Sequence, residues 1–240
     1  MSVRIEGPVT EAFHATLDRI ELLTPLPPPR RAELARLCRW RRFAAGEQIL
    51  DQHADSRDVC FIVEGAVRVV SHSASGREIS FDDIGAGGTV GEMAAVDGQP
   101  RSAAVEALSD GTLIAFLGAK AFLEVATAEP EVALAVMRRL SGIARRATER
   151  VMELSTLGAN NRVHAELLRL ARRNRRPDGT ALLRPIPVHG DLGARVSTTR
   201  ETVARVLNDL ARDGIVERTA DALVIRDLAR LEALVAEVRA

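Results

Sequence analysis

The sequence is poor in cysteine and holds no long apolar run, and each absence excludes a class of protein. Its 240 residues include only Cys38 and Cys60, too few for a disulfide scaffold or for the roughly four cysteine ligands of an iron–sulfur cluster. No apolar run approaches the roughly 18 residues that span a bilayer. The first residues, MSVRIEGPVTEAF, lack the apolar core of a signal peptide. We therefore expect a cytoplasmic protein without a membrane partner, in which both cysteines are small core residues.

Catalytic and metal-binding patterns are also missing from the sequence. The histidines lack the spacing of a metal site or a catalytic triad, and they are His14, His53, His72, His164 and His189. His72 and Cys60 are haem-ligand candidates only in the loosest sense. We expect the histidines to be structural or surface residues. The protein is then neither an enzyme nor a carrier of a metal, a haem or an iron–sulfur cluster.

The composition is that of a globular protein with an uneven distribution of charge. Hydrophobic residues make up 46% and charged residues 28% of the chain, whose length allows two modest domains. Residues 1–135 hold 13 Lys and Arg against 20 Asp and Glu, a net charge of −7. Residues 136–240 hold 20 Arg and no Lys against 13 Asp and Glu, a net charge of +7. The basic half suggests a polyanionic partner, although Arg-rich helices can also be simply solvated.

The most informative segment is residues 91–105, which read G-E-M-A-A-V-D-G-Q-P-R-S-A-A-V. Gly91 lets backbone N–H groups approach an anion closely, at the start of a short expected helix. Arg101 can donate two hydrogen bonds to phosphate oxygens, and Ser102 can donate another. The Glu92 carboxylate can accept from a sugar hydroxyl. The segment therefore suits a small ligand that carries both a phosphate and a sugar diol.

This segment resembles the phosphate-binding cassette of cyclic-nucleotide-binding domains in order and spacing. The resemblance implies that Glu92 holds the ribose 2′-hydroxyl, while Arg101 and Ser102 hold the cyclic phosphate. The expected ligand-binding residues are Gly91, Glu92, Met93, Ala94, Arg101, Ser102 and Ala103. The resemblance implies cyclic AMP or cyclic GMP as the effector, since Ser102 could serve the phosphate or reach guanine. The alternative is an ordinary Glu92–Arg101 ion pair in a β-roll that has lost its ligand.

The region around the cassette has the pattern of a small β domain. Prolines at 25–29 break the chain, and residues 30–40 predict a helix with Leu34 and Leu37 on one side. Residues 41–117 alternate short apolar runs with turn signals, which is typical of an antiparallel β barrel or jelly roll. Expected turns are the hairpin turn Glu64–Gly65, Ser73 to Gly76 and Gly85 to Gly88. The runs F-A-A-G-E-Q-I and F-I-V-E-G resemble the same cyclic-nucleotide family.

Beyond residue 130 the pattern becomes helical. Apolar residues recur at three- and four-residue steps, at Val136, Leu140, Ile143, Ala147 and Leu154. We interpret this narrow seam as a dimerising coiled-coil helix over residues 131–158; the alternative is a helix lying on its own barrel. Residues 158–161, G-A-N-N, are expected to end this helix and to supply a hinge and a cap for the next.

The basic half contains a helix-turn-helix pattern. Residues 191–195 predict a first helix, 196–197 the turn, and 198–210 a second helix. On the second helix, an arc of about 100° holds Val203, Val206, Leu207 and Leu210. A separate arc of about 140° holds Arg200, Glu201 and Arg205. One face packs and the other presents charge, as expected of a recognition helix in the major groove.

The exposed triplet has the chemistry of base recognition. Arginine donates two hydrogen bonds to guanine, and glutamate accepts from cytosine N4. The run R-E-T-V-x-R resembles the recognition helix of the cyclic-AMP receptor protein branch of the CRP/FNR regulators, which implies a TGTGA-like half-site. Thr198, Thr199 and Thr202 are plausible phosphate contacts. The alternative is a winged helix that serves protein contacts. Residues 215–225 then predict a small wing hairpin, and residues 227–238 a terminal helix.

Together these features predict an α+β protein. We expect a β jelly-roll nucleotide-binding domain in residues 1–130, a dimerisation helix in 131–158 and a winged helix-turn-helix in 159–240. The two signatures occur in the order found in CRP/FNR regulators, and the resemblance runs from about Phe13 to Ile225. It implies a homodimer that binds a palindromic operator on double-stranded DNA under the control of a cyclic nucleotide, with RNA polymerase as a further partner.

The sequence departs from that family at the base-binding position. Near relatives offer hydroxyl groups to the purine after an R-R-L segment, whereas Ile143 and Ala144 stand there in this chain. The segment between this point and the DNA-binding part is also about four residues longer, close to one helical turn. A ligand-independent regulator with a vestigial pocket therefore remains an alternative. A haem gas sensor and a cyclic-nucleotide-controlled enzyme subunit are further alternatives, without residues that favour them.

Overall fold

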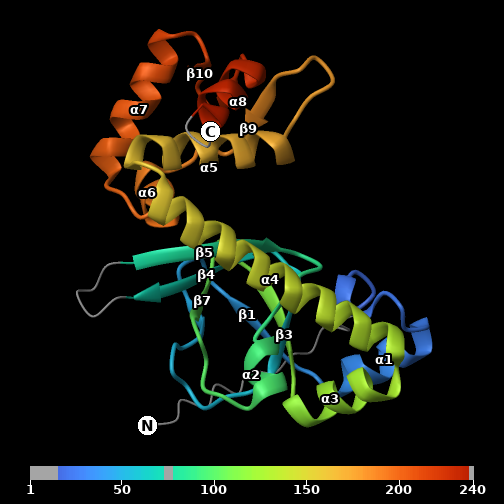
Figure 1. Ribbon diagram of the computed structural model, residues 1–240. Coiled ribbons are helices and arrows are strands. Elements are labelled where there is room, and N and C mark those ends of the chain that lie inside the picture. Colours follow the sequence, from blue (N-terminus) through green and yellow to red (C-terminus); the bar gives the residue numbers. More distant parts are fainter. Residues whose placement is uncertain (1–15, 73–77, 238–240) are drawn as a thin grey trace.

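The computed structural model describes residues 16–72 and 78–237, which form two bodies joined by one long helix (Figure 1). The predicted turn at Ser73–Gly76, Phe13 and Val238 lie outside the described residues. The first body is rich in strands and the second in helices. The α+β prediction is thereby confirmed.

Two four-stranded antiparallel sheets form the β-roll of the first body. One sheet has the order β1 (Arg39–Phe43), β8 (Thr112–Leu117), β3 (Val59–Glu64) and β6 (Thr89–Val90). The other has the order β2 (Gln48–Leu50), β7 (Ala104–Ala107), β4 (Ala66–His72) and β5 (Glu78–Gly85). Alternate residues of β3 face opposite ways, as strand geometry requires. Cys60 and Ile62 join the core between the sheets, and Val59 and Phe61 join a second core under the helices.

Gly65 is not the hairpin turn predicted from the sequence. It lies between β3 and β4, which belong to different sheets and do not pair. Gly65 has a φ of 79°, and a Cβ there would lie 2.8 Å from the Ser109 hydroxyl. A left-handed backbone and close packing therefore require glycine where the chain crosses between the sheets.

Helices cover the outer face of the first sheet. They are the 3₁₀ turn η1 (Glu21–Leu23), α1 (Pro28–Leu37) and α3 (Ala119–Ala128), with the short α2 (Glu92–Asp97) beside them. The helix predicted at residues 30–40 is displaced. It begins at Pro28, since proline suits the first turn of a helix, and β1 begins at Arg39. Leu34 is buried as expected, but Leu37, at the end of the helix, is exposed.

The long helix α4 (Pro130–Thr156) agrees closely with the predicted span, but most of its predicted seam does not face outward. Val136 and Leu140 pack against the core of the first body, and Ile143 and Ala147 line a cavity beside the β-roll. Val136 and Leu140 therefore belong to the core of their own chain and not to a dimer seam, whereas a place for Ile143 and Ala147 in such a seam stays a prediction. Part of the amphipathic pattern is thus satisfied by the first body itself, and of the predicted set Ala147 and Leu154 are exposed.

The second body has its own hydrophobic core, drawn from residues between Leu157 and Val235. It contains α5 (Ala159–Arg173), α6 (His189–Arg195), α7 (Arg200–Arg212) and α8 (Leu228–Ala236). Its antiparallel sheet has the order β10 (Val216–Arg218), β11 (Leu223–Ile225) and β9 (Ala181–Leu183). The predicted wing hairpin corresponds to β10 and β11, while β9 was not predicted.

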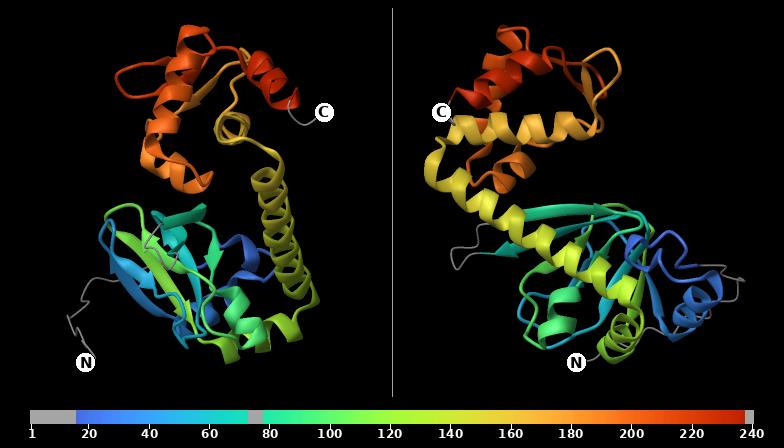
Figure 2. Two further views of the ribbon diagram at one scale, coloured as in Figure 1. Left: turned by 60° about the vertical axis from the view of Figure 1, so that its left-hand side comes forward. Right: turned by 45° about the vertical axis from the view of Figure 1, so that its right-hand side comes forward.

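The connection between α4 and α5 is very short. Gly158 occupies the N-cap position of α5, so the predicted segment does supply the cap, through its glycine and without a side-chain hydrogen bond among the described residues. Asn160 and Asn161 lie inside the first turn. The bodies also meet at a second place, where α6 lies against β5. The left view of Figure 2 shows this second junction apart from α4.

Candidate functional site

A cavity of about 310 Å³ lies between the second sheet, α2 and α4. All the expected ligand-binding residues line it, namely Gly91, Glu92, Met93, Ala94, Arg101, Ser102 and Ala103. Most of the remaining wall is apolar and includes Leu50, Val69, Ile84, Val90 and Val105. A mainly apolar hollow with a few convergent polar groups is typical of a small-molecule site.

Gly91 sets the shape of the loop that enters α2. Its φ of 86° is left-handed, and a Cβ there would lie 2.8 Å from the Asp58 carbonyl oxygen. Glycine at position 91 therefore allows the backbone there to pack closely against the backbone of Asp58. Gly98, also left-handed, ends the same short helix.

Arg101 is a buried cation held by neutral acceptors. Only 3% of the residue is exposed. Its Nε donates to Ser56 Oγ at 3.1 Å, and its Nη atoms donate to the carbonyl oxygens of Gly91 at 2.9 Å and Asp58 at 2.6 Å. These bonds use three of its five N–H groups. Burial lowers the pKa of the Arg101 guanidinium below its usual value.

In the part of the chain that the structure describes, no carboxylate forms an ion pair with Arg101. The predicted alternative of a Glu92–Arg101 ion pair is therefore wrong. A buried charge without an opposite charge is costly. An anion in the cavity would compensate for that cost, because Arg101 still has N–H groups to donate.

Glu92 is paired instead with an arginine of α4. The glutamate is 3% exposed, and its Oε1 accepts from Arg139 Nε at 2.5 Å. Arg139 also donates to the Thr89 carbonyl oxygen. The pair joins the cassette to the long helix and leaves Glu92 Oε2 available to a ligand hydroxyl. Sequence reasoning missed this role of Arg139, although the R-R-L segment was a usable signal.

The other cassette residues form the rim and walls of the cavity. Ser102 is exposed, and its hydroxyl lies 4.0 Å from the sulfur of Met93. Ala94 is buried and Ala103 half-buried, so these small side chains leave room beside Arg101. The exposed hydroxyl of Ser102 is placed to reach a ligand at the mouth of the cavity.

The far wall comes from α4 and β5 and was largely unforeseen. Ile143 lines the cavity, as expected from its place after the R-R-L segment, while Ala144 is exposed and is not part of the lining. The side chain of Arg146 lies 3.8 Å from that of Asp82. Arg150 lies over the Phe81 ring at 5.5 Å from its centroid. This end of the cavity therefore combines the apolar side chains of Ile143 and Phe81 with two arginines and a carboxylate.

The helix-turn-helix is built from α6 and α7. A Cβ on Gly193 would lie 2.9 Å from the Thr198 carbonyl oxygen, so glycine permits the close packing at the turn. Thr199 is the N-cap of α7, and its hydroxyl accepts from the Thr202 backbone N–H at 3.3 Å. The helix therefore begins at Arg200, two residues later than predicted. The predicted packing face is buried at Val203, Val206 and Leu210 and half-buried at Leu207.

The predicted recognition face of α7 is exposed. The side chains of Arg200 and Glu201 are 78% and 72% exposed, and Arg200 Nε lies 3.1 Å from Glu201 Oε1. Arg205 is exposed, and its side-chain partner among the described residues is Asn160 Oδ1, at 3.5 Å. The Glu201 backbone N–H and the Thr199 hydroxyl lower the pKa of the Glu201 carboxyl, which keeps it ionised as an acceptor. Thr198 and Thr202 are half-buried beside this face.

Arg162 of α5 holds the turn and was not foreseen. Its guanidinium donates to the carbonyl oxygens of Val196 at 2.8 Å and Ser197 at 3.1 Å. It also donates to the Leu157 carbonyl oxygen at 2.8 Å, at the end of α4. One side chain therefore ties the turn of the helix-turn-helix to the end of the long helix.

Other kinds of site find no support among the described residues. No group of three or more His, Cys, Asp and Glu is placed there to hold a metal ion. Burial raises the pKa of the Cys60 thiol to about 12, so it is protonated and a poor haem ligand. Within residues 16–72 and 78–237, no helix is long and apolar enough to cross a membrane.

Comparisons with known proteins match both parts of the chain. Residues 40–129 match the cyclic nucleotide-binding domain, and residues 161–234 match the Crp-like helix-turn-helix domain. The chain is 34% identical to the cyclic AMP receptor protein of Thermus thermophilus over 197 residues, which cover 80% of this chain and 86% of that protein. It is 26% identical to the cAMP-activated global transcriptional regulator CRP of Salmonella typhimurium over 195 residues, covering 78% and 90%.

A solved structure confirms the fold. FixK2 from Bradyrhizobium japonicum superposes with a TM-score of 0.70 at 26% identity, over 82% of this chain and 96% of that one. Both domain types, their order and the overall architecture therefore agree with the predicted resemblance. The chain belongs to the CRP/FNR family of DNA-binding transcription regulators and carries a cyclic nucleotide-binding domain.

Proposed function

We propose that the protein is a homodimeric transcription regulator controlled by a cyclic nucleotide, cyclic AMP or cyclic GMP, in the cytoplasm. The observation that carries this proposal is Arg101, a buried cation that lines the cavity without an ion-pair partner among the described residues. A cyclic phosphate supplies the missing negative charge and can accept the N–H groups that Arg101 has left.

The remaining cavity residues fit the rest of such a ligand. Ser102 donates to the phosphate from the rim, and Glu92, oriented by Arg139, accepts from the ribose 2′-hydroxyl. Gly91, Met93, Ala94 and Ala103 shape the space around the sugar and phosphate. The base then points toward α4, where Ile143 offers no hydrogen bond and Asp82 and Arg146 offer both an acceptor and donors.

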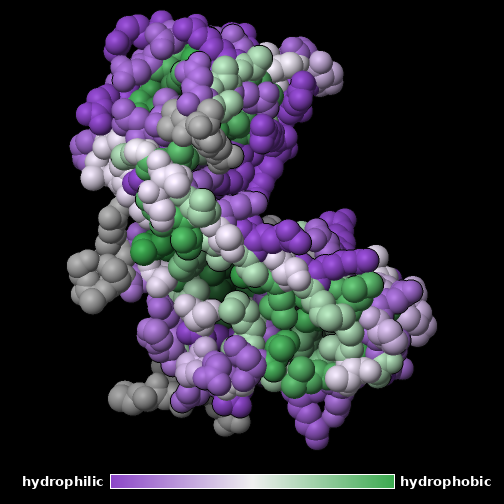
Figure 3. Space-filling model, viewed as in Figure 1, coloured by the Kyte–Doolittle hydropathy of each residue, from purple (hydrophilic) through white to green (hydrophobic). Residues whose placement is uncertain are grey.

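The outer face of α4 supports the dimer. Among its exposed positions, one stripe without charged residues follows a three–four spacing, and it consists of Leu134, Met137, Ser141, Ala144, Thr148 and Val151. Figure 3 shows hydrophobic atoms gathered along α4 on the face in view. Alternating steps of three and four are the spacing of a coiled-coil seam. We therefore assign residues 1–130 to the nucleotide-binding domain, 131–158 to the dimerisation helix and 159–240 to the DNA-binding domain.

The second body supplies the DNA contacts. Arg200, Glu201 and Arg205 read base edges in the major groove, and Thr198, Thr199 and Thr202 approach the phosphates. A symmetric dimer presents two such helices and binds a palindromic TGTGA-like operator. RNA polymerase is the partner through which the bound dimer acts on transcription.

Calorimetric titration with cyclic AMP and, separately, cyclic GMP tests the effector. Wild-type protein should bind at least one of them, and Arg101→Leu should lose at least about 100-fold in affinity because a buried charge-assisted contact is removed. Arg36→Leu, which changes an exposed arginine of α1, is the matched control. Far-ultraviolet circular dichroism checks that Arg101→Leu is folded, and unchanged affinity in that folded variant contradicts the proposal.

A DNA arm of the same experiment tests the dimer and the operator at fixed salt. A duplex with two TGTGA half-sites should bind at least about tenfold more tightly than a duplex with one, and nucleotide should tighten the complex further. A second candidate function, a ligand-independent regulator, is favoured by Ile143 at the base position. It predicts operator binding with no heat from either nucleotide.

A further inference from the structure

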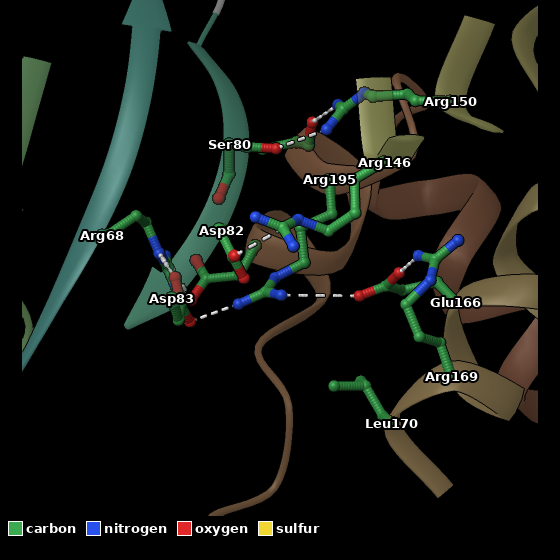
Figure 4. Close-up of polar contacts among 12 residues, drawn as sticks. Arg68, Ser80, Asp82, Asp83, Arg146, Arg150, Glu166, Arg169, Leu170 and Arg195 are labelled. Carbon is green, nitrogen blue, oxygen red and sulfur yellow. Dashed lines mark hydrogen bonds and ion pairs between the residues drawn. The ribbon is translucent and has the colours of Figure 1, made fainter. Parts of the chain in front are cut away.

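The second junction between the two bodies is ionic, and Asp83 of β5 lies at its centre (Figure 4). Its carboxylate accepts from Arg68 Nε at 2.8 Å and Arg68 Nη2 at 3.0 Å. It also accepts from Arg195, the last residue of α6. Arg68, on β4, forms a further ion pair with Asp191 of α6 at 2.7 Å. One β-roll carboxylate and one β-roll arginine thus bind two oppositely charged residues of the same short helix.

The network continues into the helix-turn-helix body. Arg195 lies between Asp83 and Glu166 of α5, and Figure 4 shows its side chain extended between them. Glu166 is buried and also binds Arg169, which reaches Glu153 of α4 at 3.0 Å. A series of ion pairs therefore runs from β5 through α6 and α5 to α4.

These contacts differ from ordinary surface ion pairs. The side chains of Arg68 and Arg195 are only 13% and 16% exposed. Exposed pairs contribute little because water and salt screen them, whereas partly buried pairs are screened much less. Loss of one partner here leaves a buried charge unpaired, which is costly. The ion pairs therefore hold α6 in one arrangement against the β-roll.

We propose that Asp83, Arg68, Asp191 and Arg195 form an ionic latch that positions the recognition helix on the β-roll and couples it to the cavity. The latch grips α6, and α6 cannot move independently of α7. Gly193 packs so closely that the Thr198 N–H donates to its carbonyl oxygen at 2.9 Å. Fixing α6 therefore fixes the direction in which α7 presents Arg200 and Glu201.

The latch and the cavity share strand β5. Asp82 and Ile84 line the cavity, and Asp83 between them points to the opposite face, because side chains alternate along a strand. Arg150 belongs to both places. It lines the cavity, donates to the Ser80 carbonyl oxygen at 2.8 Å and reaches the Ala194 carbonyl oxygen of α6 at 3.4 Å. A ligand that displaces Arg150 or this part of β5 thereby changes the contacts that hold α6.

The first test needs no ligand. Hydrogen exchange of α6 amides is compared in wild-type protein, Asp83→Asn and Asp83→Glu. Glu64→Gln is the matched control, because it removes a carboxylate that pairs with Arg42 at the exposed end of β3. Asp83→Asn should speed α6 exchange at least about tenfold, since release from the β-roll lowers local stability. Asp83→Glu, which keeps the charge, should restore much of the protection, and Glu64→Gln should leave it unchanged.

The second test rests on the proposed function. The factor by which nucleotide tightens operator binding is measured in the same variants, together with nucleotide affinity in the absence of DNA. Such coupling is typically about 5- to 150-fold. It should fall to about one in Asp83→Asn and return in Asp83→Glu. Nucleotide affinity without DNA should change less than about threefold, because Arg101 and Glu92 are intact.

The two ideas fail in different ways. Absence of nucleotide binding to the wild type overturns the proposed effector, and the exchange experiment alone then decides the latch. Wild-type protection of α6 in Asp83→Asn, or coupling that persists in it, overturns the latch. If Asp83→Asn does not fold, Arg195→Gln removes the same contact from the α6 side, and the same outcomes apply to it.

Discussion

The arginines of the cavity and those of the recognition helix have the same chemistry in opposite settings. Arg101 is buried and donates three hydrogen bonds to the protein. Arg200 and Arg205 are exposed, and among the described residues their side-chain partners are Glu201 at 3.1 Å and Asn160 at 3.5 Å. A buried, oriented guanidinium is ready for a small anion, because the protein has already met the cost of ordering it. An exposed guanidinium becomes ordered only when a base or phosphate arrives.

Loss of a buried charge and loss of an exposed charge also have different consequences. Removing one partner inside the protein leaves the other buried without a counter-charge, which destabilises the fold. Removal of an exposed arginine or glutamate from α7 is expected to leave the fold intact and to weaken only the proposed DNA binding. Three substitutions test this difference between buried and exposed charges, and they follow in descending order of the change in free energy.

The sharpest test is Arg139→Met, which leaves the buried Glu92 carboxylate unpaired. The free energy of unfolding should fall by about 3–5 kcal/mol, measured by urea denaturation at neutral pH. The neighbouring exposed residue gives the control, Arg138→Met, which should change it by less than about 0.5 kcal/mol. Equal effects of the two substitutions would show that the buried Glu92–Arg139 pair contributes no more to the free energy of unfolding than an exposed arginine does.

Glu201→Ala tests the exposed side of the comparison. Discrimination at one base pair of the operator half-site should weaken by about 1–3 kcal/mol, while nonspecific DNA affinity and stability stay nearly constant. Competition binding against duplexes with single-base changes measures it at fixed salt. Asn208→Ala, at an exposed position further along α7, is the control. An unchanged operator preference after Glu201→Ala would disprove the assigned recognition face.

Thr199→Ala tests a residue with both a structural role and a binding role, since Thr199 is a helix cap and an expected phosphate contact. Loss of the cap should lower the free energy of unfolding by about 1 kcal/mol without DNA, seen as a lower thermal midpoint. Thr198→Ala, which removes a hydroxyl one residue earlier, should have a smaller effect on stability. A larger loss of stability in Thr198→Ala than in Thr199→Ala would show that Thr199 is not the N-cap of α7.

Local patterns in the sequence predicted the parts of the molecule that depend on neighbouring residues. The cassette is contiguous, so Gly91, Glu92 and Arg101 could be placed together before the fold was known. The buried face of α7 follows from its own period, and Val203 and Val206 are indeed in the core. These features are decided within a single turn, loop or helix.

Features that depend on distant partners were missed or misassigned. Arg139 is 47 residues from Glu92, and no spacing rule connects them. The apolar stripe of α4 was correctly recognised, but a period cannot tell whether the partner is a second chain or the helix's own β-roll. The Glu64–Gly65 turn was placed correctly in the chain, yet the change of sheet depends on which strands pair with β3 and β4.

The short connection at Gly158 has a consequence for protein engineering. The core of the second body draws on residues from Leu157 onward, and the two other cores on residues up to Leu140. Judged by these cores alone, a cut at Gly158 separates two interchangeable modules. A chimera made there would nevertheless leave Arg68 and Asp83 without their partners Asp191 and Arg195. The modules are separable in their apolar interiors but matched in their charges, so a functional graft must carry a complementary acid and base on its first helix-turn-helix segment.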